Sequence, residues 1–288
     1  MEIKLIDFNA KFAEEYFAWC KQHPEAVADE DKVDDLYFDM LDAWLDKPQS
    51  WLDGMSPNGY FHAIEDPQML VSILIEYLRE EIELPDPLLH CILHHKDEIV
   101  PIFHGILMAD ESPDMQADEL LDIQAEIIHL LRELDAKPLY IRYLTVMSTL
   151  DEECAYAEAA CEALEDGGED VKELLYEAYP DMKGYCRSCI IDLLSSLLPD
   201  ERTLAILKDA WREGEEDEAF LAECMGRYGD EAALPLLRQA AAEPNIDYYL
   251  FKELKNAIEA ISGEEIPERD FYGDKLFDML ASEDEDGN

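Results

Sequence analysis

Apolar residues along this chain recur at intervals of three and four positions, and no segment alternates apolar and polar residues over the length of a β-strand. A period near 3.6 residues places apolar side chains on one face of an α-helix. In the N-terminal third the pattern predicts helices over about 9–22, 33–45 and 67–81, with a short helix after Ser56. The sequence therefore predicts an all-α fold.

The starts of several helices are marked by a serine or aspartate that directly precedes a proline. The side chain of such a residue accepts a hydrogen bond from a free N–H of the first turn, and proline suits the first helical position because no N–H is needed there. We expect helices to begin at four such pairs: Ser56–Pro57, Asp66–Pro67, Asp86–Pro87 and Ser112–Pro113.

From about residue 97 the predicted helices come in short antiparallel pairs. Both helices of a pair recur at a spacing of about thirty residues, which is the mark of a solenoid. The apolar face of one pair is too large to bury alone, so successive pairs must stack. The first helices are expected to begin near Ile99, Leu139, Val171, Thr203 and Ala232, and the second helices to end near Leu134, Leu164, Leu198, Tyr228 and Ile261.

Particular segments carry a resemblance to a known kind of repeat. Tyr228-Gly-Asp-Glu-Ala-Ala-Leu-Pro-Leu-Leu-Arg, and similarly Ile99-Val-Pro-Ile-Phe, resembles the turn and first helix of a short bacterial HEAT-like repeat of the PBS-lyase type. Arg187-Ser-Cys-Ile-Ile-Asp-Leu-Leu-Ser-Ser-Leu and Leu254-Lys-Asn-Ala-Ile-Glu-Ala-Ile resemble its second helix. The resemblance implies an α-α superhelix, a HEAT-like solenoid, that acts as a binding scaffold, and it leaves the partner open.

The organisation predicted from these patterns has three parts. Residues 1–95 are expected to form an N-terminal helical cap, and residues 96–262 the HEAT-like repeats. The first repeat is atypical because its second helix, Asp114 to Leu134, is long. Residues 263–288 are expected to form an acidic tail with one short helix that includes Leu276 and Leu280, and the last seven residues are expected to be disordered.

The charge is extreme, with 70 acidic against 22 basic residues and a net charge of −48, and it is spread over the whole chain. Such a surface repels nucleic acid, whose binding requires Lys and Arg. The plain interpretation is a solvated acidic surface that keeps the chain soluble. The alternative is a basic protein partner, or mimicry of nucleic acid toward a nucleic-acid-binding protein.

The seven cysteines and the lengths of the apolar runs indicate in which cellular compartment the protein is expected. The N-terminus has no apolar segment of the kind found in signal peptides, and no run of about 18 apolar residues predicts a membrane span. We therefore expect free thiols in a reducing cytoplasm. Cys186 and Cys189 form a Cys-x-x-Cys within a helical segment, without the preceding strand of a thioredoxin-like motif, and both are expected to be core thiols.

One cluster is a candidate for metal chemistry. His90 and His94 lie one helical turn apart, with Glu98 close in sequence, and two imidazoles at this spacing can bind one zinc ion. No Glu occupies the second position of a His-Glu-x-x-His motif, and a third ligand is not evident. The alternative interpretation places these histidines around an inter-helix turn.

No nucleophile elbow, phosphate-binding loop or dinucleotide-binding loop is present, so the sequence predicts a non-catalytic protein-binding scaffold without a cofactor. Tyrosine and tryptophan are enriched at interfaces, although they also fill half-buried helix contacts. If the concave face binds a protein, we expect it to be lined by Tyr143, Tyr176, Trp211 and Tyr248. Two alternatives remain: an acidic decoy or immunity-type protein that binds a basic partner, and a metal-dependent enzyme that uses His90 and His94.

Overall fold

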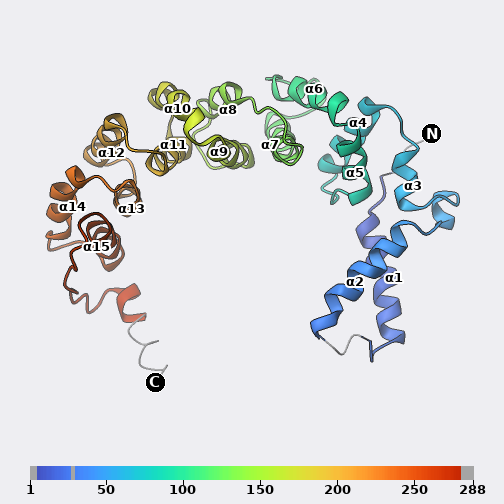
Figure 1. Cartoon of the computed structure of the whole chain (residues 1–288), viewed down its shortest axis with the longest axis horizontal. Helices are drawn as coiled ribbons and strands as arrows, with labels where there is room; N and C mark the ends of the chain where they lie inside the picture. Colours follow the sequence, from blue (N-terminus) through green and yellow to red (C-terminus); the bar gives the residue numbers. More distant parts are fainter. Residues whose placement is uncertain (1–4, 27–29, 280–288) are drawn as a thin grey trace. The chain divides into compact units, whose positions relative to one another are not determined.

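The computed structural model describes residues 5–26 and 30–279, and all regular secondary structure within them is helical, which confirms the all-α prediction. The helices form two compact units, an N-terminal unit of residues 1–139 and a C-terminal unit of residues 140–288 (Figure 1). None of the helices in the described ranges is long and apolar enough to cross a membrane.

In the N-terminal unit, α4 contacts α5, α6 and α7, while α3 packs on α5 and α1 packs on α2. The helices expected over 9–22, 33–45 and 67–81 are present as α1, α2 and α4. The helices of this unit are α1 (Phe8–Gln22), α2 (Glu30–Leu45), the 3-10 helix η1 (Ser50–Leu52), α3 (Pro57–His62), α4 (Pro67–Arg79), α5 (Asp86–His94), α6 (Lys96–Leu107) and α7 (Ala117–Glu133).

The division between the units falls after Leu139, whereas the sequence placed a domain boundary near residue 95. Helices α6 and α7, which the sequence assigned to the first repeat, contact each other and both also pack on α4 of the N-terminal unit. Ile99 and Phe103 of α6 are fully buried in the N-terminal unit. Burial of these side chains makes α6 part of that core.

Two of the four predicted helix starts are capped as expected. Ser56 Oγ accepts the Gly59 N–H at 3.1 Å, and Asp66 Oδ1 accepts the Gln68 N–H at 3.0 Å. Helix α5 begins at Asp86 itself, whose negative charge favours the first turn of a helix. These three proline pairs therefore do mark helix starts.

The start predicted at Ser112–Pro113 was wrong, because α7 begins at Ala117. The side chain of Glu119 accepts the Gln116 N–H at 3.3 Å and so closes the first turn of α7 there. Arg79 donates both to the Glu119 carboxylate and to the backbone carbonyl of Asp114, at 2.7 and 3.4 Å. These contacts hold the segment before Ala117 as a turn outside the helix.

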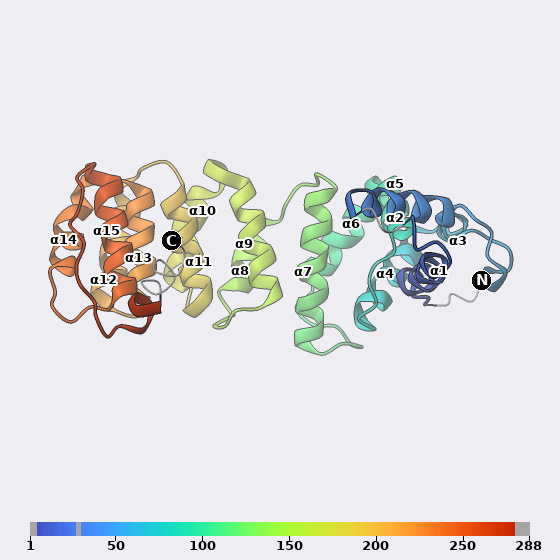
Figure 2. The ribbon, with the colours of Figure 1, turned by 90° about the horizontal axis from the view of Figure 1, so that it is seen from below.

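The C-terminal unit contains the four helical pairs predicted from about residue 139 onward. In Figure 1, α9, α11, α13 and α15 lie in one layer, and α8, α10, α12 and α14 lie in another. Neighbouring helices of the first of these layers contact one another (Figure 2). The helices are α8 (Tyr140–Met147), α9 (Ala155–Gly167), η2 (Gly168–Val171), α10 (Lys172–Ala178), η3 (Tyr179–Asp181), α11 (Gly184–Ser196), α12 (Glu201–Glu213), α13 (Glu218–Tyr228), η4 (Glu231–Ala233), α14 (Leu234–Ala241) and α15 (Tyr248–Ser262).

Polar contacts at a regular sequence separation join successive pairs of this unit. Tyr176 of α10 shares a hydrogen bond of 2.6 Å with Thr203 of α12, across 27 positions. Arg187 of α11 donates to the Glu215 carboxylate, in the turn before α13, at 3.1 Å across 28 positions. These separations are close to the length of one pair, as expected where successive pairs stack in a similar way.

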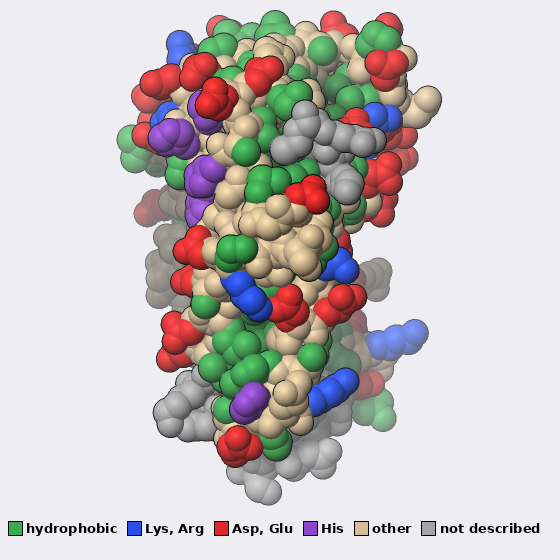
Figure 3. Space-filling model, turned by 90° about the vertical axis from the view of Figure 1, so that its right-hand side faces the viewer, with side chains coloured by type: hydrophobic (Ala, Val, Ile, Leu, Met, Phe, Trp, Pro, Cys, Tyr) green, Lys and Arg blue, Asp and Glu red, His purple; other side chains and the backbone are tan. Residues whose placement is uncertain are grey.

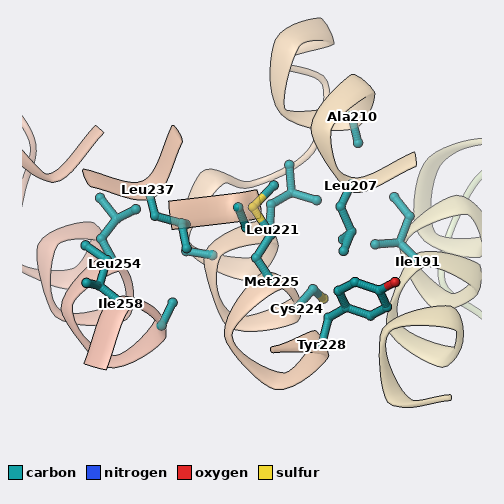
Figure 4. Packing of buried hydrophobic residues seen from close by; sticks show 13 residues of the cluster. Ile191, Leu207, Ala210, Leu221, Cys224, Met225, Tyr228, Leu237, Leu254 and Ile258 are labelled. Carbon is teal, nitrogen blue, oxygen red and sulfur yellow. The ribbon is translucent and has the colours of Figure 1, made fainter. Parts of the chain in front are cut away.

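The core of the last pairs is continuous from α11 to α15. Leu207, Leu221 and Leu254 are fully buried and come from three different helices (Figure 4). Burial of each such side chain contributes about 1.5–3 kcal/mol. The stack is therefore held by an apolar interior that extends from one pair to the next.

The chain beyond α15 packs back onto that helix. Phe271 is 9% exposed, with its ring centroid 5.1 Å from that of Phe251. Asp274 Oδ2 accepts the N–H of Tyr248 at the start of α15, at 3.1 Å. Residues 275–279 are helical, in agreement with the short helix expected in this region. Leu280 and the predicted disordered end lie outside the described residues.

Candidate binding grooves of the C-terminal unit

Tyr143 and Tyr176, two of the four predicted partner-binding aromatic residues, are both engaged in contacts within the unit. Tyr143 is 1% exposed, so its prediction was wrong: the ring fills the core and offers no surface to a partner. Tyr176 is half-buried, its hydroxyl is 2.6 Å from Thr203 Oγ1, and the Arg202 guanidinium lies 3.8 Å from the centre of its ring. These contacts make Tyr176 a link between α10 and α12.

The other two predicted aromatic residues lie at the far end of the unit. Trp211 borders a hollow of about 400 Å³ between α12 and α14, together with Leu236 and Ile246. Tyr248 is packed against Phe271 and Phe277, with ring centroids 5.6 and 5.2 Å away. Trp211 thus remains a candidate contact residue, whereas the C-terminal segment lies against Tyr248.

The histidine cluster lies on the N-terminal unit. His90 and His94 belong to α5, whereas Glu98 belongs to α6, where it lies 3.5 Å from His95 Nδ1. Figure 3 shows histidine side chains gathered on one face of this unit. Within residues 5–26 and 30–279, no three His, Cys, Asp or Glu side chains are placed to hold a metal ion together, as a structural or catalytic zinc site requires.

A groove of about 400 Å³ that is lined by several carboxylates lies between α9 and α11. Glu158, Glu162 and Glu165 share one face of α9 because they are three and four positions apart. Asp192 of α11 adds a fourth carboxylate. The remaining lining residues of this α9/α11 groove are Cys161, Tyr185, Ser188, Cys189, Leu193 and Phe220.

A second groove of about 480 Å³ lies between α13 and α15. Glu223 and Glu253 supply its carboxylates, and Arg227 and Asn256 supply its hydrogen-bond donors. Its other lining residues are small: Gly226, Ala257 and Ala260. Because these side chains are small, the surface between α13 and α15 is concave, and we call it the α13/α15 groove.

One ion pair joins the two grooves. Arg227, which lines the α13/α15 groove, pairs with Asp192, which lines the α9/α11 groove, and also donates to Ser195 Oγ at 2.7 Å. Burial alone would lower the pKa of the Arg227 guanidinium, but the Asp192 carboxylate raises it above its ordinary value. Arg227 therefore stays charged, and acidic side chains flank it on both sides.

The sequence analysis did not single out these carboxylates. The spacing of Glu158, Glu162 and Glu165 was a usable signal, but a chain with 70 acidic residues contains many such patterns. Asp192, Glu223 and Glu253 join them only through the packing of α9, α11, α13 and α15. No protein-family model, curated protein or solved structure matches this chain.

Proposed function

We propose that this chain is a non-catalytic protein-binding scaffold of the helical-repeat, HEAT-like class. Four stacked helical pairs, with several contacts between successive pairs at separations of 27 to 29 positions, support this class. A solenoid of this kind presents an extended surface rather than a single enclosed site. The α-α superhelix and the cytoplasmic location belong to the same proposal.

The binding surface in this proposal is the pair of grooves along α9, α11, α13 and α15, and its partner is a basic segment of another protein. The observation that carries the proposal is that six carboxylates from these four helices line two adjoining grooves. Carboxylates grouped in a concave surface raise the local concentration of cationic ligands and favour their binding. Lysine and arginine side chains provide that charge.

A direct test compares two variants that have lost the same number of charges. The groove variant carries Glu158→Gln, Glu165→Gln, Glu223→Gln and Glu253→Gln. The control variant carries four substitutions at exposed acidic positions of the same unit outside the grooves: Glu152→Gln, Glu201→Gln, Glu231→Gln and Glu265→Gln. The probe is a labelled peptide rich in lysine and arginine, with a neutral peptide of the same length as reference, and binding is followed by fluorescence anisotropy.

We expect the groove variant to bind the basic peptide about tenfold more weakly than the wild type, and the control variant to change affinity less than about twofold. Binding should also weaken between ~50 and ~300 mM salt, since screening acts on exposed charges. Equal losses in the two variants would mean that total charge, and not the grooves, attracts the peptide, and would refute the proposed site.

A further inference from the structure

Two cysteine side chains from neighbouring helices line the α9/α11 groove. Cys161 belongs to α9 and Cys189 to α11, two helices that pack against each other, and both side chains line the groove between them. Both side chains are half-buried and both line the groove, so small molecules in solvent can reach them. The two thiols thus lie in one groove and are both accessible.

The other cysteine of the Cys-x-x-Cys differs from Cys189. Cys186 is fully buried, as the sequence predicted, and burial raises the pKa of its thiol to about 12. Cys189 is only half-buried, so its prediction as a core thiol was wrong. The cysteine that shares the groove with Cys189 is Cys161, 28 positions earlier in the sequence, and not Cys186.

The surroundings of Cys189 favour its thiolate. A hydrogen bond from the Cys161 thiol lowers the pKa of Cys189 below its ordinary value, against the effect of burial, and a hydrogen bond with Tyr185 acts in the same direction. The thiolate is the form of cysteine that reacts with oxidants. Cys161, in contrast, keeps its proton, because that hydrogen bond and burial raise its pKa.

We propose that Cys161 and Cys189 are a redox-modification site at which a peroxide closes a disulfide between α9 and α11. In the first step the Cys189 thiolate attacks hydrogen peroxide, which breaks the O–O bond and gives a sulfenic acid and hydroxide. In the second step the Cys161 sulfur attacks the Cys189 sulfur, and the sulfenic oxygen leaves as water. In sum, two thiols and one peroxide give one disulfide and two waters.

The groove selects the class of oxidant by charge. Glu158, Glu162 and Asp192 line it and repel anionic oxidants such as glutathione disulfide, whereas hydrogen peroxide is small and neutral. The disulfide would fix α9 to α11 along the same groove. This inference depends on the thiols and the groove alone, and not on the identity of any protein partner.

The test uses the reduced full-length chain, treated with a small excess of hydrogen peroxide, alkylated, and digested without reductant for mass spectrometry. Cleavage after Arg187 separates Cys186 from Cys189, and cleavage after Glu158 separates Cys154 from Cys161. We expect a cross-linked pair of peptides that contains Cys161 and Cys189 and disappears with dithiothreitol.

The matched control is Cys154→Ser, which removes a half-buried thiol at the start of α9 and should leave the cross-link intact. In Cys161→Ser, a sulfenic acid should persist at Cys189 and react with dimedone. A cross-link between Cys186 and Cys189 in its place would overturn the proposal. So would full alkylation of Cys161 and Cys189 in the wild type at a peroxide dose that oxidises free cysteine.

Discussion

Gly226 of α13 lies directly against Ala257 of α15: a Cβ on Gly226 would stand 2.8 Å from the Ala257 Cα and 3.0 Å from its Cβ. A Cβ atom essentially never lies within 3.0 Å of a carbon atom in another part of the chain to which it is not bonded, so the two helices approach at a distance that only glycine allows at this position. Glycine within a helix ordinarily costs about 1 kcal/mol relative to alanine. At Gly226 that cost is offset by the close packing of α13 on α15.

Gly226→Ala should therefore destabilise the chain by about 1–3 kcal/mol, because the new methyl group overpacks the α13–α15 contact. The control is Gly105→Ala in α6, where an added Cβ meets nothing within 4 Å, and this change should be neutral or stabilise by up to about 1 kcal/mol. Unfolding in urea, followed by circular dichroism, measures both. A Gly226→Ala variant as stable as the Gly105→Ala variant would contradict the packing argument.

Two neighbouring residues in the segment after α15 differ strongly in their exposure to solvent. Phe271 is 9% exposed and packs on Phe251, whereas Tyr272 is 90% exposed. Phe271→Ala should cost about 3 kcal/mol and should speed proteolysis of residues 263–279, because the ring that fixes this segment is gone. Tyr272→Ala should change stability by less than about 0.5 kcal/mol. Equal proteolysis rates for the two variants would show that Phe271 does not fix the segment.

Alkaline pH should destabilise the C-terminal unit through its buried thiols. Burial raises the pKa of Cys224 to about 12 from an ordinary value of 9.0. The unfolded chain therefore releases this proton first, so the stability is fully present below about pH 9 and is lost as pH rises toward 12. Each such thiol adds a slope of up to about 1.4 kcal/mol per pH unit.

In Cys224→Ala the loss of stability above pH 9 should be less steep than in the wild type, while Cys186, whose pKa is also about 12, keeps part of the slope. Urea unfolding between pH 7 and pH 11 gives the two curves. Parallel curves would mean that Cys224 ionises in the folded and unfolded chains alike.

Salt should raise the melting temperature of the chain. With 70 acidic and 22 basic residues, most carboxylates have no cation to pair with, and their mutual repulsion opposes the compact state. Raising sodium chloride from ~20 to ~500 mM shortens the screening length to a few ångströms and should increase the melting temperature by several degrees. A fall would mean that exposed ion pairs such as Arg202–Glu173 contribute more than the repulsion costs.

The helices could be predicted closely from local signals. Ser56 and Asp66 cap their helices because capping depends on residues within one turn. Ser112–Pro113 has the same local signal, yet Arg79, 35 positions from Asp114, holds that segment outside α7. A contact between residues so far apart in sequence cannot be predicted from the residues around Ser112.

The sequence by itself determined that the chain is helical, where its helices lie, and that they recur in pairs of about thirty residues, since a helix depends on apolar spacing and caps within a few turns. The tertiary structure decided which side chains share a surface. In the folded chain Tyr143 is buried, and Cys189 lines the same groove as Cys161. Carboxylates from α9, α11, α13 and α15 line two grooves. Burial and contact between helices depend on the packing of residues about thirty positions apart, which a local pattern does not encode.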